Sequence, residues 1–428
     1  MKTGAGVAKV YDAVIVGGGP AGTSASVHLA AGGARVALVE RERFPRAKLC
    51  GEFISPECLA HFARLGVLEE MREGRGARLA ETRFFARSGR GVSVPSAWFG
   101  AETTGDAEAC ALGLSRAEMD QRLLLHARAA GVEVFEETRV TGLLFGDGGR
   151  RTVGGVRVER EGAESELRAG VTIDATGRAR ALARRVEGLA RGDGTNGTND
   201  ADGADGERAR AMAASSRRMP LVAFKAHLEN AGGGEGVCEI YFYRGGYGGL
   251  SRVENGFSNL CFIVAAGDVR ERASDAERVM REIVMSNTRA AETLRGARVR
   301  SEWLAVALES FGRRELVPCD GLLTVGDAAS FIDPFTGSGM LMALESGELA
   351  SECVARALPR LRSGGGSFAM LATDYRARYR ARFAARLRVC SWLRRAAFAP
   401  GLATEASIIA LGASERVRRV LARATRPA

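Results

Sequence analysis

The sequence predicts an α/β protein, α+β overall, that joins a Rossmann-type nucleotide-binding domain with a parallel sheet to an antiparallel β-sheet substrate domain and a C-terminal helical tail. Three observations support this fold class: a glycine-rich turn between a strand and a helix near the N-terminus, a segment from 220 to 265 with strand-like patterns, and an arginine-rich amphipathic segment at 373–398. The 428 residues exceed one ordinary core and suit two joined domains.

Composition places the chain among globular proteins. Its hydrophobic fraction of 46% and charged fraction of 26% match the globular average, which argues against a disordered or membrane-embedded protein. No apolar run reaches spanning length and no signal-peptide segment precedes the first strand, so we expect a cytoplasmic protein. The eight cysteines occur singly and the four histidines lie far apart, so we predict neither a disulfide framework nor a metal site.

The formal net charge of +10 does not by itself predict nucleic-acid binding. The excess is carried by arginine, and much of it lies toward the C-terminus. We therefore interpret the charge as a local feature of the tail and predict no nucleic-acid partner.

The N-terminal unit has the order strand, turn, helix, strand. An apolar run, a glycine-rich turn at 17–22, an Ala-rich helix and a β-branched run ending at Glu40 follow one another. The turn has the pattern GxGxxG, in which Gly17 permits the tight bend, Gly19 admits a pyrophosphate and Gly22 lets helix and strand touch. Glu40 would accept hydrogen bonds from ribose hydroxyls, and the amides at the start of the helix would bind the pyrophosphate anion. The candidate binding residues of this unit are Gly17, Gly19, Pro20, Ala21, Gly22, Glu40 and Arg41.

The segments that follow alternate between the two predicted sheets. We expect a hairpin near 80–100, a helix that begins at Ser115 as its cap and extends to 130, and a strand at 132–135. Short strands between glycine turns follow from 138 to 173.

The second half begins with an insertion and then returns to the first domain. Residues 188–218 are rich in Gly, Asp and Asn and poor in apolar side chains, which predicts disorder. Three strand-length runs between 220 and 265 predict an antiparallel sheet. The later elements are expected to be a helix near 274–296, strands at 304–310 and 321–327, and a helix after Gly339.

The segment 373–398 predicts an amphipathic basic helix. Tyr375, Tyr379 and Phe383 repeat at helical spacing, and arginines occupy the remaining faces. Two interpretations stay open: the aromatic stripe packs on the body of the protein, or the helix docks on an anionic membrane surface, which would place the protein at the inner membrane surface.

These elements predict a discontinuous domain organisation. The predicted units are a nucleotide-binding domain of 1–80 with 110–187 and 316–362, a substrate domain of 81–109 with 219–315, the insertion 188–218, and a helical region of 363–428.

A second glycine-rich turn follows the strand at 321–327. The segment GLLTVGDAASFIDPFTGSGMLMALE, residues 321–345, begins with that strand and leads through glycines into a helix. Together with VIVGGGPAG and Glu40, RAKLCGE at 46–52, LSRAEMDQRL at 114–123 and IDATG at 173–177, it resembles the FAD-dependent geranylgeranyl reductase family, within the hydroxylase-like flavoprotein monooxygenase superfamily. The resemblance covers most of the chain.

The resemblance implies one FAD, with its ADP half at the first turn and its flavin at the second. Asp327 would bind the ribityl chain, and Arg116 would lie near the phosphates or ribose. Gly337 to Gly339 and the following helix N-terminus would face the flavin edge that becomes anionic on reduction. The other cofactor-binding residues that it implies are Cys50, Gly51, Asp174, Gly177, Gly326, Pro334, Ser338 and Met340.

Two groups of side chains are candidates for chemistry and substrate binding. Relatives carry a cysteine close to flavin and substrate in the loop of Cys50, which makes it a candidate catalytic residue; a buried inert thiol is the alternative. Tyr241, Tyr243 and Tyr247 would line an apolar pocket or belong to the sheet core. The turn beyond them lacks the Trp and Phe-Pro-Lys of archetypal geranylgeranyl reductases.

The resemblance implies an oxidoreductase in which reduced FAD delivers hydride to a carbon–carbon double bond of an apolar, isoprenoid-like substrate. The sequence has no second GxGxxG unit, so an external donor, NAD(P)H or a protein, would supply the electrons. An FAD-dependent monooxygenase acting on an aromatic or polyketide-like compound is the alternative reaction, and halogenation is disfavoured because no WxWxIP segment is present. A non-catalytic prenyl-binding escort protein is the alternative of another class. The intact glycines, Glu40 and Asp327 argue against it, because such a protein has a degenerate cofactor site.

Overall fold

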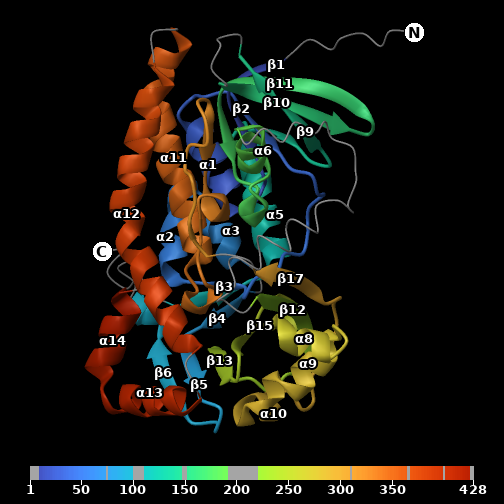
Figure 1. Ribbon diagram of the computed structural model, residues 1–428, viewed down its shortest axis with the longest axis vertical. Helices are drawn as coiled ribbons and strands as arrows, with labels where there is room; N and C mark the ends of the chain where they lie inside the picture. Colours follow the sequence, from blue (N-terminus) through green and yellow to red (C-terminus); the bar gives the residue numbers. More distant parts are fainter. Residues whose placement is uncertain are drawn as a thin grey trace.

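The computed structural model describes residues 9–73, 76–99, 110–146, 152–190, 220–308, 311–363, 367–398 and 401–424. Two sheet layers lie one above the other along the long axis, and the long helix α12 (Phe368–Ala397) runs beside both (Figure 1). The insertion predicted at 188–218 lies outside the described residues, except that 188–190 form the end of α6 (Ala181–Ala190).

The upper layer in Figure 1 contains the N-terminal strand. Its strands are β1 (Lys9–Val16), β2 (Val36–Val39), β8 (Glu133–Phe135), β9 (Arg139–Phe145), β10 (Val153–Arg160), β11 (Ala163–Asp174) and β19 (Leu322–Thr324). Over the described residues the order is β8-β2-β1-β11-β10-β9, and β19 pairs with β11. The pairs from β8 to β11 and the β11–β19 pair are parallel, whereas β11–β10 and β10–β9 are antiparallel. This is the parallel sheet of the Rossmann-type unit that the sequence predicts, extended by an antiparallel edge.

Helices α1 (Pro20–Ala31) and α11 (Gly339–Arg362) pack closely on this sheet. The Ser24 hydroxyl donates to the Leu344 carbonyl at 2.9 Å, and a Cβ on Gly347 would lie 2.3 Å from the Ala21 carbonyl oxygen. The two backbones therefore touch. Further helices of this layer are α2 (Pro56–Leu65), α3 (Leu68–Arg72) and α5 (Arg116–Ala129).

The lower layer is a second sheet formed by β5 (Glu81–Phe85), β6 (Gly91–Pro95), β12 (Leu221–Glu229), β13 (Val237–Tyr243), β14 (Gly246–Arg252), β15 (Ser258–Ala265), β16 (Arg298–Val299) and β17 (Leu304–Leu308). The order is β16-β12-β15-β14-β13-β5-β6, with β17 paired to β12. Its pairs are antiparallel, as predicted, except for β13 and β5, which are parallel. That exception arises because the β5–β6 hairpin comes from an earlier part of the chain, so no tight turn sets its direction relative to β13.

The two faces of the second sheet differ because successive side chains of a strand point to opposite sides. Tyr241, Tyr243 and Phe262 belong to a core shared with α9 (Ala276–Glu282) and α10 (Thr288–Leu294). Phe242, Tyr247 and Ile263 belong to a different cluster, on the face that meets the second glycine turn.

The single helix expected near 274–296 is instead α9 and α10, preceded by α8 (Ala266–Glu271). The chain leaves helical geometry at Asn287, whose side-chain oxygen accepts a hydrogen bond from Ala290 N and caps α10. Its side-chain nitrogen donates to the carbonyls of Phe85, Ala86 and Phe242 at 2.9 to 3.1 Å. These bonds to the sheet interrupt the helix, which a propensity argument could not foresee.

Small elements connect the two layers. They are β3 (Phe53–Ile54), β4 (Ala77–Leu79) and β7 (Ala111–Gly113) in one sheet, and β18 (Gly312–Arg313) with β20 (Ser330–Phe331) in another.

Helix α12 packs on the body by its aromatic stripe. Tyr375, Tyr379 and Phe383 are buried, and the Tyr375 hydroxyl donates to the Thr324 carbonyl at 2.7 Å. A buried ion pair of 2.5 Å joins Arg386 to Glu345 of α11. Two shorter helices follow, α13 (Gly401–Ala413) and α14 (Glu415–Ala424). In the described part of the chain, no helix has both the length and the apolar character that crossing a membrane requires.

Candidate functional site

The first glycine turn connects β1 to α1 as predicted, and its shape depends on backbone contacts. Gly17 has a φ of +111°, and a Cβ there would lie 2.4 Å from the Ala175 carbonyl oxygen. A Cβ on Gly22 would lie 1.9 Å from the Gly17 carbonyl oxygen. Gly19 differs, because the nearest atom to its Cβ would be Nη2 of Arg116 at 3.8 Å. The turn is therefore closely packed on the protein side and open at Gly19.

Glu40 directly follows β2, and its carboxylate points toward this turn. It accepts hydrogen bonds from Gly18 N at 2.9 Å and Glu42 N at 3.0 Å, and it forms an ion pair of 3.3 Å with Arg46. Arg41, which was also predicted to bind the cofactor, is exposed and pairs with the neighbouring Glu42. Pro20 and Ala21 are buried in the first turn of α1.

Arg116 begins α5 and lies beside the first turn. Its guanidinium forms a two-point ion pair with Asp120 at 2.7 and 2.8 Å, and Asp120 also pairs with Arg46. Burial acts to lower the pKa of Arg116, but the Asp120 carboxylate outweighs it and raises that pKa above its ordinary value. Arg46 and Asp120 were not predicted; Asp120 falls one helical turn after Arg116, a spacing that could have suggested the pair.

The second region begins at Gly326-Asp327, directly after β19. A Cβ on Gly326 would lie 2.9 Å from the Ala21 Cβ, so this segment touches the start of α1. Burial raises the pKa of Asp327, and the charges of Arg178, Arg116 and Lys48 oppose that rise. Among the described residues, none hydrogen-bonds the Asp327 carboxylate.

The second glycine turn follows at Pro334 to Met340 and leads into α11. Gly337 has a φ of +62°, which favours glycine, and its Cβ would lie 3.3 Å from the Phe53 ring. Ser338 and Met340 are buried, whereas a Cβ on Gly339 would meet no atom within 4 Å. This turn therefore borders open space at the N-terminus of α11.

Asp174 and Gly177 lie between the two regions. The Asp174 carboxylate accepts hydrogen bonds from Thr176 N and Oγ1 and from Leu182 N and Ala183 N, at 2.6 to 3.1 Å. All four donors belong to the loop after β11 or to α6, so this side chain fixes the shape of the loop and the start of α6. Gly177 has a φ of +68°, and a Cβ there would meet no atom within 4 Å.

The loop of Cys50 carries a buried charged cluster that the sequence did not reveal. Cys50 is partly buried, and its carbonyl accepts a hydrogen bond from Asn259 Nδ2 at 3.2 Å. Glu52 is fully buried, and its carboxylate contacts Lys225 Nζ at 2.5 Å and His227 Nε2 at 2.6 Å. It also accepts a bond from Arg116 N at 2.8 Å.

Glu52 holds this loop in place against local strain. Its φ of +53° is unusual for a residue with a side chain. Contacts with Lys225 and His227 of β12 and with Arg116 of α5 tie the loop to both layers. Lys225 interrupts the apolar run LVAFKAHL, and that isolated lysine was the available signal for a buried partner.

The three candidate tyrosines are not brought together. The hydroxyls of Tyr241 and Tyr243 are bonded inside the core on the face toward α9 and α10, Tyr241 to Thr293 at 2.9 Å and Tyr243 to the Ile263 carbonyl at 3.1 Å. Tyr247 points to the opposite face, where its hydroxyl donates to Asp333. Strand alternation thus leaves Tyr247 alone beside the second glycine turn.

An aromatic cluster joins the second sheet to the second glycine turn. The Phe335 ring centroid lies 5.3 Å from Tyr247, 5.6 Å from Phe242 and 5.9 Å from Phe84. Phe398, at the end of α12, lies 5.9 Å from Tyr247. We call these five residues the aromatic cluster.

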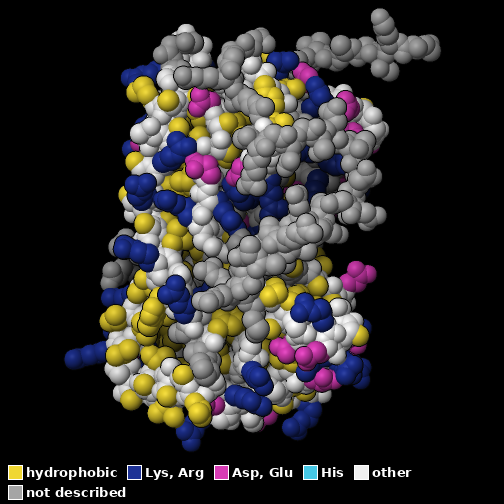
Figure 2. Space-filling model, in the orientation of Figure 1, with side chains coloured by type: hydrophobic (Ala, Val, Ile, Leu, Met, Phe, Trp, Pro, Cys, Tyr) yellow, Lys and Arg dark blue, Asp and Glu magenta, His cyan; other side chains and the backbone are white. Residues whose placement is uncertain are grey.

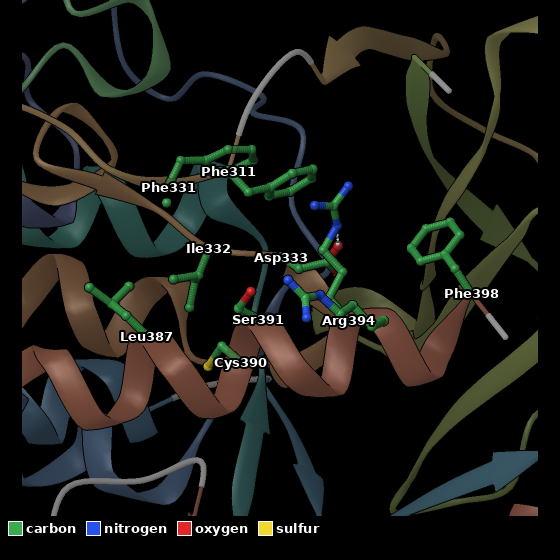
Figure 3. A pocket seen from close by; sticks show the side chains of 11 residues that line it. Phe311, Phe331, Ile332, Asp333, Leu387, Cys390, Ser391, Arg394 and Phe398 are labelled. Atoms are coloured by element: carbon green, nitrogen blue, oxygen red, sulfur yellow. Dashed lines mark ion pairs between the residues drawn. The ribbon is translucent and has the colours of Figure 1, made fainter. Parts of the chain in front are cut away.

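A cavity of about 320 Å³ opens beside the aromatic cluster, between α12 and the segment before the second glycine turn (Figure 3). Phe311, Phe331 and Leu387 line it, and Arg394 reaches across to pair with Asp333 at 3.1 Å. Burial raises the pKa of Asp333. The described residues contain no group of His, Cys, Asp and Glu that could hold a metal ion.

Comparison with known proteins places this geometry in a family. The family described as "FAD binding domain" matches residues 10–347, well over half of the chain. The chain is similar to the digeranylgeranylglycerophospholipid reductase of Methanosarcina mazei, at 26% identity over 81% of this chain and 76% of the relative. It is also similar to the menaquinone reductase of Mycolicibacterium smegmatis, at 28% identity over 80% of this chain and 75% of the relative.

Solved structures share the fold. A geranylgeranyl bacteriochlorophyll reductase-like protein from Thermoplasma acidophilum superposes with a TM-score of 0.74 at 18% identity, covering 97% of this chain and 96% of its own. A flavin-dependent brominase superposes with a TM-score of 0.72 at 20% identity, covering 97% and 94%. With the family match over both glycine turns, this chain belongs to the FAD binding domain family and is an FAD-dependent oxidoreductase.

Proposed function

We propose that this protein reduces a carbon–carbon double bond of an apolar, isoprenoid-like substrate by hydride transfer from reduced FAD. The observation that carries the proposal is the aromatic cluster, which provides an apolar wall beside the second glycine turn. The names of two relatives, a digeranylgeranylglycerophospholipid reductase and a menaquinone reductase, denote reduction of substrates with isoprenoid chains.

The residues present fit FAD. Gly19 leaves the backbone open for a pyrophosphate, and the helix amides and the nearby Arg116 suit its charge. Glu40 would bind the ribose, and the carboxylate of Asp327, which no described residue hydrogen-bonds, would bind the ribityl hydroxyls. The open face of Gly339 at the start of α11 suits the flavin. We further propose that the upper layer is the FAD-binding domain and the lower layer the substrate domain, with the boundaries predicted from the sequence.

When bound and reduced, FAD would supply the hydride to one carbon of the double bond, and a proton from solvent or a nearby side chain would reach the other carbon. The aromatic cluster would orient the substrate and exclude water from it, because apolar rings hold an apolar chain without polar competition. Cys50 would act at the reacting end of the substrate. The hydrogen bond from Asn259 and the contacts of Glu52 hold its loop in place. An external donor such as NAD(P)H would supply the electrons.

The proposal is tested by incubating the FAD-loaded enzyme without oxygen, with NAD(P)H and a geranylgeranyl lipid or menaquinone. A donor-dependent product heavier by two hydrogens in mass spectrometry would support it. An oxygen-dependent product heavier by one oxygen atom would replace it with a monooxygenase. Protein that stays colourless and takes up no FAD would favour the prenyl-binding escort protein.

We also propose that the protein contacts a membrane peripherally, where such substrates dissolve. The aromatic stripe of α12 is buried, so that helix can offer a membrane only its arginine-rich outer face. Vesicle sedimentation that does not depend on anionic lipid would contradict this contact.

A further inference from the structure

Helix α13 exposes an apolar face to solvent. Leu402 and Ile409 are 88% and 52% exposed, and with the exposed Ala406 and Ala413 they form one stripe at helical spacing. The only charged residue of α13, Glu405, is bonded through its carboxylate to Ser88 of the β5–β6 turn, at 2.8 and 2.9 Å. The outer face of α13 therefore carries no charge.

Helix α14 continues this apolar surface and adds positive charge. Val417 and Val420 are 48% and 66% exposed on one side of the helix, and the exposed Arg416 flanks them. Figure 2 shows hydrophobic side chains gathered over α13 and α14 at the lower left, with basic side chains around them. We call the exposed Leu402, Ile409, Val417 and Val420, with the exposed Arg416 and Arg419, the α13–α14 face.

The net charge around this face is positive. From 388 to 424 the chain contains seven arginines and two glutamates. One glutamate is the Ser88-bonded Glu405, and the other, Glu415, pairs with Arg419 at 2.8 Å. An apolar ridge bordered by arginines complements a bilayer with anionic headgroups: the apolar residues enter the headgroup boundary while the arginines meet the phosphates.

The inner side of α13 faces the proposed substrate region. Ile408 and Leu411 pack in the same cluster as Tyr247, Phe335 and Phe398. A single helix thus separates the α13–α14 face from the aromatic cluster, and the cavity lined by Leu387 and Arg394 opens at the end of α12 that leads into α13.

We propose that the α13–α14 face docks on the surface of an anionic lipid bilayer, next to the route by which an apolar substrate reaches the aromatic cluster. The inference rests on the proposed function for the nature of that substrate, but the docking itself can be measured without turnover.

The test is sedimentation of the full-length, FAD-loaded protein with vesicles of phosphatidylcholine alone or mixed equally with phosphatidylglycerol. The wild type should bind the anionic vesicles more tightly. Leu402→Gln with Ile409→Gln should weaken binding about tenfold or more, because two apolar side chains no longer enter the boundary. The matched control is Met370→Gln, which removes a 62% exposed side chain at the opposite end of α12 and should leave binding unchanged.

The charge contribution is tested separately with Arg416→Gln and Arg419→Gln, which remove two exposed arginines of α14. Their combined loss should weaken binding to anionic vesicles about thirtyfold and have little effect on phosphatidylcholine vesicles. Removal of the exposed Arg160 and Arg168, which belong to β10 and β11 in the upper layer, is the control.

Three results would overturn the proposal: wild-type protein that binds neither vesicle, binding that survives the loss of Leu402 and Ile409, or a dimer in light scattering that disappears in that variant, which would assign the face to a second copy. Detergent-dispersed substrate distinguishes this failure from failure of the proposed function. The Leu402/Ile409 variant should reduce it as the wild type does, whereas a vesicle-binding protein that reduces nothing would refute only the function.

Discussion

The two glycine-rich turns differ in what surrounds their glycines. In the first, a Cβ on Gly17 or Gly22 would overlap backbone atoms at 2.4 and 1.9 Å, so the protein's own packing requires glycine there. In the second, a Cβ on Gly339 would meet nothing within 4 Å. Gly19 resembles the second turn, since only Arg116 approaches its Cβ position, at 3.8 Å.

This difference separates glycines that hold the fold from glycines that leave room for a ligand. A substitution at Gly22 should damage folding, whereas substitutions at Gly19 and Gly339 should damage FAD binding in a protein that still folds. The loop from Cys50 to Phe53 connects the two turns, because Glu52 bonds to Arg116 near the first and Phe53 packs on Gly337 of the second.

The largest effect is expected when this connecting loop loses its charge. Glu52→Gln would leave the buried Lys225 without its carboxylate partner, at a cost of about 3–5 kcal/mol in unfolding free energy. Denaturant unfolding of the wild type and the variant measures this loss of unfolding free energy. Adding Lys225→Met should recover part of the loss, because an apolar pair replaces the charged one; a double variant as unstable as the single would contradict the charge explanation.

The destabilisation caused by Glu52→Gln should depend on pH. Burial alone would raise the pKa of Glu52, but the contacts of His227 and Lys225 outweigh it and lower that pKa below its ordinary value of 4.5. A carboxyl group whose pKa is lowered in the folded state contributes its full stabilisation when the pH is above its ordinary pKa. That stabilisation is lost as the pH falls through the pKa of the folded state. The Tm difference between wild type and Glu52→Gln should therefore be full at neutral pH and shrink below about pH 4.5.

Gly22→Ala is expected to have the next largest effect on stability. Its Cβ overlaps the Gly17 carbonyl, and neither backbone can yield without moving α1 from β1, so we expect a loss of about 1–3 kcal/mol. Thermal unfolding of the FAD-free protein gives the value. An unchanged Tm would mean that the first turn is not as tightly packed as the structure shows.

Gly19→Val should separate binding from folding. The side chain would occupy the space left for the pyrophosphate, so FAD retention should be lost, while the unfolding free energy of the FAD-free protein changes by about 1 kcal/mol or less. Gly339→Ala is the parallel variant at the second turn, with a weaker loss of FAD. Absorbance of the purified proteins reports the bound flavin, and a fully loaded Gly19→Val protein would refute this assignment.

The smallest structural effect is expected from Cys50→Ala. Its thiol is partly buried and lies in the loop that Glu52 holds, so the fold and FAD content should persist. If Cys50 acts on the substrate, turnover should fall about tenfold or more with little change in KM. Unchanged turnover would leave the thiol as a packing residue only.

Local pattern was sufficient to predict the first turn, its strand and helix, and the parallel sheet, because GxGxxG and the apolar periodicity act within a few residues of one another. The expected helix at 274–296 was wrong because Asn287 bonds to sheet carbonyls that are distant in sequence. Likewise, the sequence could group Tyr241, Tyr243 and Tyr247 but could not say which face of the sheet each would occupy.

By itself, the amino-acid sequence determined the fold class, the cofactor family and the position of both glycine turns. Only the tertiary structure decided that Gly326 touches Ala21, that Glu52 meets Lys225 and His227 of another layer, and that α13 keeps its apolar face outward. The physical reason is that glycine turns and helical periodicity act over short sequence distances, whereas buried charge pairs and exposed faces depend on which distant surfaces meet.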